Sequence, residues 1–129
     1  MNQGLKEMKW RSRCTISCAL DVVGDKWSLL ILRDLLLYET RSFTEFSKAP
    51  EGIATNILSA RLKKLKELGL IEQVKNERMN KMMYALTESG RDFEGVLRMA
   101  DAWSSKHLAD YQPRLVSLSD MGYSGPSAQ

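Results

Sequence analysis

The sequence predicts a mainly α-helical domain with one small β-hairpin, and three observations support this fold class. Apolar residues recur at helical spacing in several segments, most clearly in residues 52–68. Two short stretches, residues 70–75 and 81–86, surround a polar turn, which indicates a β-hairpin. The chain has 129 residues, 43% hydrophobic and 27% charged, which is typical of one globular domain with a single core.

The first two expected helices lie on either side of a Gly-Asp pair. Residues 14–23 should form a short helix that Gly24 ends in a left-handed conformation. Asp25 should cap the next helix, which is apolar on nearly all sides and is therefore expected to be the central buried helix. Arg33 and Asp34 are expected at its periphery.

Two further helices are expected around a Pro-Glu-Gly turn. A short helix should start at Ser42 or Thr44 and stop before Pro50, because a residue that precedes proline avoids the helical region. The next helix should cover residues 55–68 and end at Gly69.

The 55–68 helix has one apolar side and one polar, basic side. Leu58, Leu62 and Leu65 recur at i, i+4 and i+7. Between Ile53 and Lys66 the chain holds four cations and no acid. Short polar side chains followed by cations suit a helix that lies in a DNA major groove, where the former reach base edges and the latter reach phosphates. The alternative is a solvated amphipathic helix of a small protein without this role.

The order of these elements is that of a winged helix-turn-helix domain. In this motif the N-terminal residues of the second helix reach bases, and the hairpin tip falls near the flanking backbone. Arg61 lies toward the apolar side of its helix, so an internal ion pair is its alternative role. The expected DNA-binding residues are Ser42, Thr55, Asn56, Ser59, Arg61, Lys63, Arg78 and Lys81.

A long last helix predicts a dimer. Thr87 should cap a helix over residues 88–111, which would be about 36 Å long at 1.5 Å per residue. The upstream core cannot cover that length, so a second chain is expected to cover Trp103, Leu108 and Tyr111. Their packing onto the same subunit is the alternative. Two-fold pairing would place two recognition helices about 34 Å apart and would select a palindromic site.

The chain is expected to have three parts. Residues 1–13 form a flexible N-terminal arm, and residues 14–111 form the winged helix-turn-helix domain with its N- and C-terminal dimerisation helices. Residues 112–129 form a flexible C-terminal tail, in which apolar residues between Leu115 and Leu118 offer a weak docking point.

Composition excludes several classes of function. The net charge is only +3, but residues 41–91 hold ten Lys/Arg against six Asp/Glu, so the positive excess lies in the expected DNA-binding part. One His, and cysteines outside any metal-ligand spacing, argue against a metal site. No apolar run suits a membrane span, and two cysteines without an export signal indicate the reducing cytoplasm. No catalytic arrangement or cofactor-binding loop is present, so we do not expect an enzyme or a cofactor.

Several separated motifs occur together in order along residues 14–111. They are Cys14, Ala19-Leu20-Asp21-Val22-Val23-Gly24-Asp25-Lys26-Trp27, Leu30-Ile31-Leu32-Arg33-Asp34-Leu35, Arg41-Ser42-Phe43-Thr44-Glu45-Phe46, the spaced Ile53, Leu58, Arg61, Leu62, Leu65, Gly69 and Leu70, and Tyr84-Ala85-Leu86-Thr87-Glu88-Ser89-Gly90. These motifs resemble the HxlR-type winged-helix transcriptional regulators, a bacterial family related to the MarR type. The resemblance implies a homodimer in which each subunit presents one recognition helix to half of an operator. It also implies pairing through residues 14–23 and 88–111.

Cys14 lies where this family often has a cysteine that senses oxidants or electrophiles in a number of members. The nearby Arg11 and Arg13, together with a helix start, favour its thiolate. Cys14 and Cys18 are one helical turn apart, so a disulfide between them would be strained and a bridge to a partner subunit would be easier. The alternative is two inert side chains at an interface.

The sequence therefore predicts a cytoplasmic, sequence-specific regulator that binds double-stranded DNA as a homodimer at a palindromic operator. Repression is the expected mode of action, with redox sensing through Cys14. Two alternatives stay open. A regulator of the same fold would respond to a small-molecule effector held in a cleft between the dimer helices and the core. A winged-helix docking module would instead bind an acidic protein and no DNA.

Overall fold

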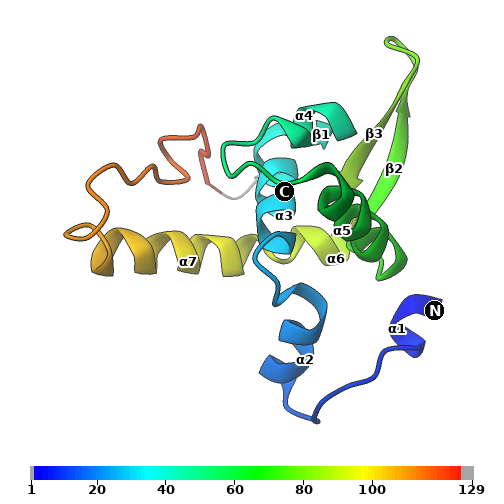
Figure 1. The fold of residues 1–129 in the computed structure, drawn as a ribbon, viewed down its shortest axis with the longest axis horizontal. Helices are drawn as coiled ribbons and strands as arrows, with labels where there is room; N and C mark the ends of the chain where they lie inside the picture. The colour runs from blue at the N-terminus through cyan, green and yellow to red at the C-terminus, as the bar shows by residue number, and fades with distance from the viewer. Residues whose placement is uncertain (1, 126–129) are drawn as a thin grey trace.

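The computed structural model describes residues 2–125 and confirms a mainly helical fold with a small antiparallel sheet (Figure 1). Helices α2 and α7 extend away from the body in different directions, and the β2–β3 hairpin extends on another side. The elements are α1 (Gln3–Lys6), α2 (Thr15–Val23), α3 (Ser28–Tyr38), β1 (Thr40–Arg41), α4 (Phe43–Ser47), α5 (Thr55–Glu67), β2 (Ile71–Asn76), β3 (Lys81–Leu86), α6 (Glu88–Arg91) and α7 (Glu94–His107).

Helix α3 is the central helix, as its apolar sequence predicts. Leu32 and Leu35 are fully buried, and Figure 1 shows α3 between α5, α6 and the base of the sheet. The prediction that Asp34 is peripheral is wrong, because its side chain is buried beneath Arg33. The ion pair with Arg33 offsets the cost of burying the carboxylate.

Asp25 caps the start of α3, as predicted. Its Oδ1 accepts hydrogen bonds from the backbone N–H groups of Trp27 and Ser28, both at 2.9 Å. The expected left-handed end at Gly24 is wrong, because its φ is −78°. Glycine is needed there for space: a Cβ would lie 2.3 Å from the carbonyl oxygen of Leu20.

Helices α4 and α5 form the helix-turn-helix, with the boundaries that the sequence predicts. Ser42 caps α4, and the buried Phe46 packs edge-on against Tyr84 of β3, with ring centroids 6.1 Å apart. Helix α5 ends at Gly69, whose φ of +82° is left-handed and therefore favours glycine. The phenylalanine contact thus ties the first helix of the motif to the sheet.

The predicted hairpin is present, and a third strand joins it. Strands β2 and β3 pair in register from Ile71–Leu86 to Asn76–Lys81. The short β1 pairs antiparallel with the other edge of β3, so the strand order is β1-β3-β2. Two residues are too few to show alternation, so the sequence pattern carries no signal for β1.

The prediction of one helix over residues 88–111 is wrong. The segment forms α6 and α7, with a turn at Asp92 and Phe93 between them, and α7 ends at His107. Gly90 of α6 packs so closely on the Leu70 carbonyl that any Cβ would overlap it, which fixes the position of α6. Helix α7 has 14 residues and is therefore about 21 Å long.

Both predicted flexible segments contact the body over the residues that the structure describes. Helix α1 packs on the end of α5, where the Gly4 backbone approaches the Glu67 carbonyl. In the tail, Leu118 is 4% exposed and its backbone N–H donates to Asp101 Oδ1 at 2.9 Å. Leu118 is therefore the residue by which the tail docks on the body. Residues 1 and 126–129 lie outside the described residues. Within residues 2–125, no helix has the length and apolar character to cross a membrane.

Candidate nucleic-acid interface

Helix α5 buries its leucines and exposes its short polar side chains. Leu58, Leu62 and Leu65 are at most 2% exposed and belong to the core. Four of the predicted DNA-binding residues of this helix are exposed to solvent, namely Thr55, Asn56, Ser59 and Lys63. The structure therefore brings these four side chains together on one accessible side of the helix.

Arg61 makes the internal ion pair that its position toward the apolar side suggested. Its Nε lies 3.2 Å from Asp25 Oδ1, and the two side chains are 32% and 19% exposed. Burial opposes ionisation of Asp25, but hydrogen bonds from Ser28 and Trp27, together with the charge of Arg61, lower the pKa of this carboxyl overall. Arg61 thus has a charged partner inside the fold, and we do not carry it into the proposed DNA contacts.

The other lysines of α5 differ in their partners. Lys64 Nζ lies 3.3 Å from the carbonyl oxygen of Asp21, and Lys66 Nζ lies 2.7 Å from Gln73 Oε1. Within residues 2–125, Lys63 has neither a hydrogen-bond partner nor an ion-pair partner. Lys63 is therefore the cation of α5 that is free to meet a phosphate.

Ser42 has an internal role. It is 2% exposed, and its hydroxyl accepts a hydrogen bond from the Glu45 backbone N–H at 3.2 Å. In return, the Ser42 backbone N–H donates to Glu45 Oε1 at 2.9 Å, which lowers the pKa of that carboxyl. This reciprocal capping box occupies the side chain. The expected phosphate contact of Ser42 is corrected to a helix-capping role.

The hairpin has two of the predicted cations at or near its tip, Arg78 and Lys81. Arg78 is exposed in the turn, and Lys81 is half-buried at the start of β3, paired with Asn76. The hairpin extends beyond the body beside α5 (Figure 1). The exposed Lys75 on β2 adds a cation that the motif argument missed.

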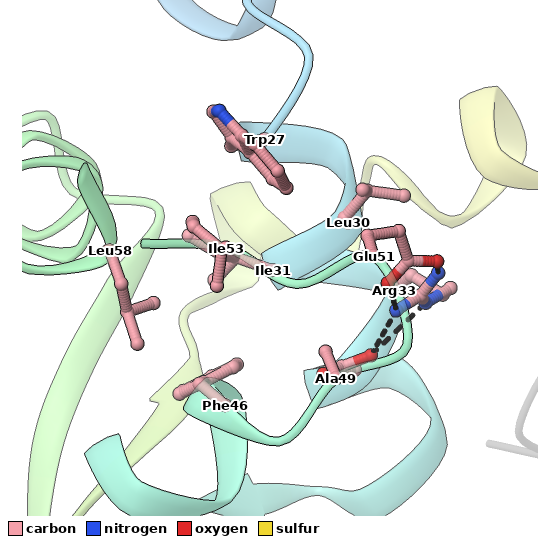
Figure 2. Close-up of a pocket in the computed structure, with 10 residues that line it drawn as sticks. Trp27, Leu30, Ile31, Arg33, Phe46, Ala49, Glu51, Ile53 and Leu58 are labelled. Carbon is pink, nitrogen blue, oxygen red and sulfur yellow. Dashed lines mark hydrogen bonds and ion pairs between the residues drawn. The ribbon is translucent and has the colours of Figure 1, made fainter. Parts of the chain in front are cut away.

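The turn between α4 and α5 is tied to α3 by a partly buried ion network that the sequence did not predict. Arg33 Nη1 lies 2.7 Å from Glu51 Oε2, and Arg33 Nη2 lies 2.8 Å from Asp34 Oδ1. The hydrogen bond with Glu51 raises the pKa of Arg33, and the same bond lowers the pKa of Glu51. Figure 2 shows Arg33 and Glu51 beside a cavity behind Leu58. Its volume of about 20 Å³ admits one water molecule, so it is too small for a ligand.

An apolar face is exposed on α2 and α7. Ile16 and Leu20 of α2 are 70% and 52% exposed, and Val96, Met99 and Trp103 of α7 are also exposed. A groove of about 350 Å³ separates the two helices near Phe93, with an almost wholly apolar lining. Single exposed apolar residues are ordinary, but a contiguous set marks a surface for association.

Cys14 is exposed at the N-terminus of α2. Hydrogen bonds from the backbone N–H groups of Ser17 and Ile16 lower the pKa of its thiol. The helix start therefore favours the thiolate, as predicted, whereas Arg11 pairs with Asp21. Cys18 is half-buried, with its Sγ 3.5 Å from the Ser12 carbonyl oxygen.

The fold is that of a winged helix-turn-helix regulator of transcription. It has the central helix α3, the helix-turn-helix of α4 and α5, and the β2–β3 hairpin beside α5. Residues 22–112 match the HxlR-like helix-turn-helix family, and the chain belongs to that family. A regulator of transcription, and not an enzyme, is what the family and its relatives indicate.

Comparison with individual proteins agrees with this assignment. The HTH-type transcriptional regulator YtcD of Bacillus subtilis (strain 168) is 32% identical over 101 residues, 78% of this chain and 79% of that protein. The crystal structure of PA1607 has a TM-score of 0.71 at 35% identity and covers 92% of this chain and 82% of that one. The redox regulator HypR in its oxidised form has a TM-score of 0.62 at 26% identity, over 73% and 97% of the two chains. The chain spans 59% of the mycobacterial relatives it matches.

Proposed function

We propose that this protein binds a palindromic operator as a homodimer and represses transcription in the cytoplasm. The observation that carries the proposal is the exposed polar side of α5, which the buried leucines hold outward beside the hairpin. Thr55, Asn56 and Ser59 approach base edges, because they lie near the N-terminus of the helix that enters the major groove. Lys63 and the hairpin cations hold phosphates on either side.

The homodimer rests on the apolar face of α2 and α7. Helix α7 ends at His107 and is shorter than the sequence predicts, so its length no longer supports a dimer. The exposed apolar side chains of Leu20, Met99 and Trp103 support it instead. A second copy that covers these side chains removes a contiguous apolar surface from water. An isologous contact of this kind has two-fold symmetry, which a palindromic operator matches.

Titration of fluorescent DNA from the region upstream of the gene, at 50 and 200 mM salt, tests the DNA proposal. We expect tight binding at low salt, strong weakening at high salt, and weaker binding to a scrambled duplex of equal length. The rival docking module predicts little DNA affinity at either salt concentration. That result would refute the proposed function and would redirect attention to acidic protein partners of α5.

We propose further that Cys14 makes the regulator responsive to oxidants. Its exposure and its lowered pKa favour the thiolate, and the similar HypR is a redox regulator. The thiolate would attack one oxygen of hydrogen peroxide, the O–O bond would break, and the other oxygen would leave as hydroxide, which gives a sulfenic acid at Cys14. A thiol of the partner subunit would then displace water to form a cross-subunit disulfide.

Mass spectrometry after mild peroxide treatment tests this proposal. We expect a covalent dimer in the parent protein, none in Cys14→Ser, and a lower operator affinity after oxidation. Cys18→Ser is the matched control, and it distinguishes a Cys14–Cys14 bridge, which survives, from a Cys14–Cys18 bridge, which is lost. An unchanged yield of covalent dimer in Cys14→Ser would refute the assignment.

A further inference from the structure

A cleft much larger than the cavity behind α5 lies on the opposite side of the α4–α5 turn. It has a volume of about 670 Å³, within the usual range of small-molecule sites. The end of α3, Arg41 of β1, the α4–α5 turn and the C-terminal tail line it. Figure 1 shows the tail, in orange and red, returning toward α3. Because Leu118 anchors the tail in the core, this side of the lining is part of the fold.

The lining of the cleft is positively charged. Four cations and two carboxylates line it, and both carboxylates, Asp34 and Glu51, are bound by the same residue, Arg33. The cations that remain are Arg41, Lys48 and Arg114. Across residues 2–125, none of these three takes part in an ion pair. The lining of the cleft therefore has an excess of positive charge, although the Glu45 carboxylate outside the lining also attracts Arg41.

Arg41 is held in place and carries an unused donor. Its guanidinium lies over the Tyr38 ring, 4.1 Å from the centroid, and Nη2 donates to the Glu45 backbone carbonyl at 3.3 Å. The Glu45 carboxylate accepts from the Ser42 backbone N–H through Oε1, and it attracts Arg41 without forming an ion pair with it. Arg41 Nε is buried and has no acceptor among the described residues. Such an unpaired donor is uncommon and unfavourable.

The rest of the lining is apolar. Leu37 and Tyr38 contribute from α3, and Val116 and Met121 contribute from the tail. A site that combines unpaired cations with aromatic and aliphatic walls recognises a ligand that has an anionic group and an apolar body.

We propose that this cleft binds a small organic anion, namely an aromatic carboxylate or sulfonate. Its charged group lies between Arg41, Lys48 and Arg114, and its ring lies against Tyr38 and the tail. The site is separate from the apolar groove between α2 and α7 and from the base-reading side of α5.

The position of the cleft connects the ligand to the helix-turn-helix. Lys48 and Glu51 belong to the segment that joins α4 to α5, so an occupant contacts the turn that sets the angle between these helices. A ligand that binds one arrangement of this turn more tightly than another shifts the protein toward that arrangement. The affinity for DNA can then change by at most the ratio of the ligand's affinities for the two arrangements. This regulatory part rests on the proposed function, whereas the binding part needs no DNA.

Isothermal titration with 2-naphthoate, compared with the neutral 2-naphthamide, tests the binding part in the full-length protein. We expect naphthoate to bind at least ten times more tightly. Lys48→Gln and Arg114→Gln each should weaken it about two- to fivefold, and the double variant about tenfold, as expected for solvent-accessible charge contacts. Lys106→Gln, an exposed lysine on α7, is the matched control and should leave binding unchanged.

Thermal unfolding of each variant verifies the fold, and Lys48 and Arg114 are both exposed, so their loss leaves the core intact. Equal binding of naphthoate and naphthamide, or unchanged binding in the double variant, would overturn the proposal. A separate DNA titration with saturating naphthoate should shift the operator affinity at least threefold. Naphthoate binding without this shift would overturn the regulatory part only, and failure to bind DNA without any ligand would count against the proposed function only.

Discussion

Replacing Lys63 by glutamine tests whether the free cation of α5 contacts DNA phosphate. Lys63 is exposed and has no partner in the described chain, so its loss changes little inside the fold. If the proposed dimer uses Lys63, Arg78 and Lys81 of each subunit, it makes six phosphate contacts. The logarithm of its binding constant should then fall with the logarithm of salt concentration at a slope of about −5.4. Lys63→Gln removes two contacts and should reduce the slope to about −3.6.

These slopes are readily distinguished. Between 50 and 200 mM salt the parent protein should lose about 1,800-fold in affinity, and Lys63→Gln about 150-fold. Fluorescence anisotropy with the operator and with a scrambled duplex measures both, and the loss at Lys63 should be the same on each, since phosphates carry no sequence information. Lys106→Gln on α7 should keep the parent slope. A Lys63→Gln protein with the parent slope would refute the placement of α5 against the backbone.

Three further perturbations have equally specific outcomes. Asn56→Ala should keep the melting temperature but cost about 1–3 kcal/mol of discrimination at one base pair, measured with single-position operator variants; full selectivity would contradict the assigned role. Glu51→Gln should destabilise the fold by about 1–2 kcal/mol at pH 7 in urea unfolding. Because Arg33 lowers the pKa of Glu51 in the folded state, the stability from this pair is present above the unfolded pKa and is lost as pH falls through the folded pKa. The gap between the two proteins should therefore close on acidification from pH 5, and a constant gap would argue against the ion pair. Leu20→Asp should give a monomer by light scattering and should reduce the operator affinity. The control Leu115→Asp should stay dimeric. A dimeric Leu20→Asp protein would show that the subunits pair through another surface.

Periodic and capped segments were predictable from the sequence. The apolar repeat of Leu58, Leu62 and Leu65 and the glycine at position 69 define α5 almost to the residue. The same repeat assigns Thr55 and Asn56 to the opposite, exposed side. These features are local, because helix periodicity and end signals depend on neighbouring residues.

Features that depend on distant contacts were not predictable from local patterns. The close approach of Gly90 in α6 to the Leu70 carbonyl, and the break that follows α6, are not visible in the helical pattern. The sequence pattern places Arg33 and Asp34 at the exposed periphery of α3. In the structure Arg33 pairs with Asp34 and also with Glu51, which lies 17 residues beyond Asp34 in the chain. The composition of the tail predicted a flexible segment. Its docking through Leu118 depends on a distant residue, Asp101 of α7, so no local pattern could reveal it.

The candidate site shows the same division. Exposure on α5 followed from helical spacing, and exposure of Arg78 followed from its place in a polar turn, whereas the role of Ser42 did not follow from its position. Its sequence position suits both a phosphate contact and a helix cap, and only the return hydrogen bond to Glu45 distinguishes the two. For Arg61, both roles were open until the position of Asp25 relative to α5 was known.

Two contacts link the recognition helix to the ends of α2 and α3 that face each other. Lys64 donates to the carbonyl oxygen of Asp21 in α2, and Arg61 pairs with Asp25, the carboxylate that caps α3. The recognition helix is thus held to the end of α2 at one point and to the start of α3 at another. A rotation of α2 relative to α3 would therefore displace α5, and in the proposed dimer it would change the spacing of the two recognition helices.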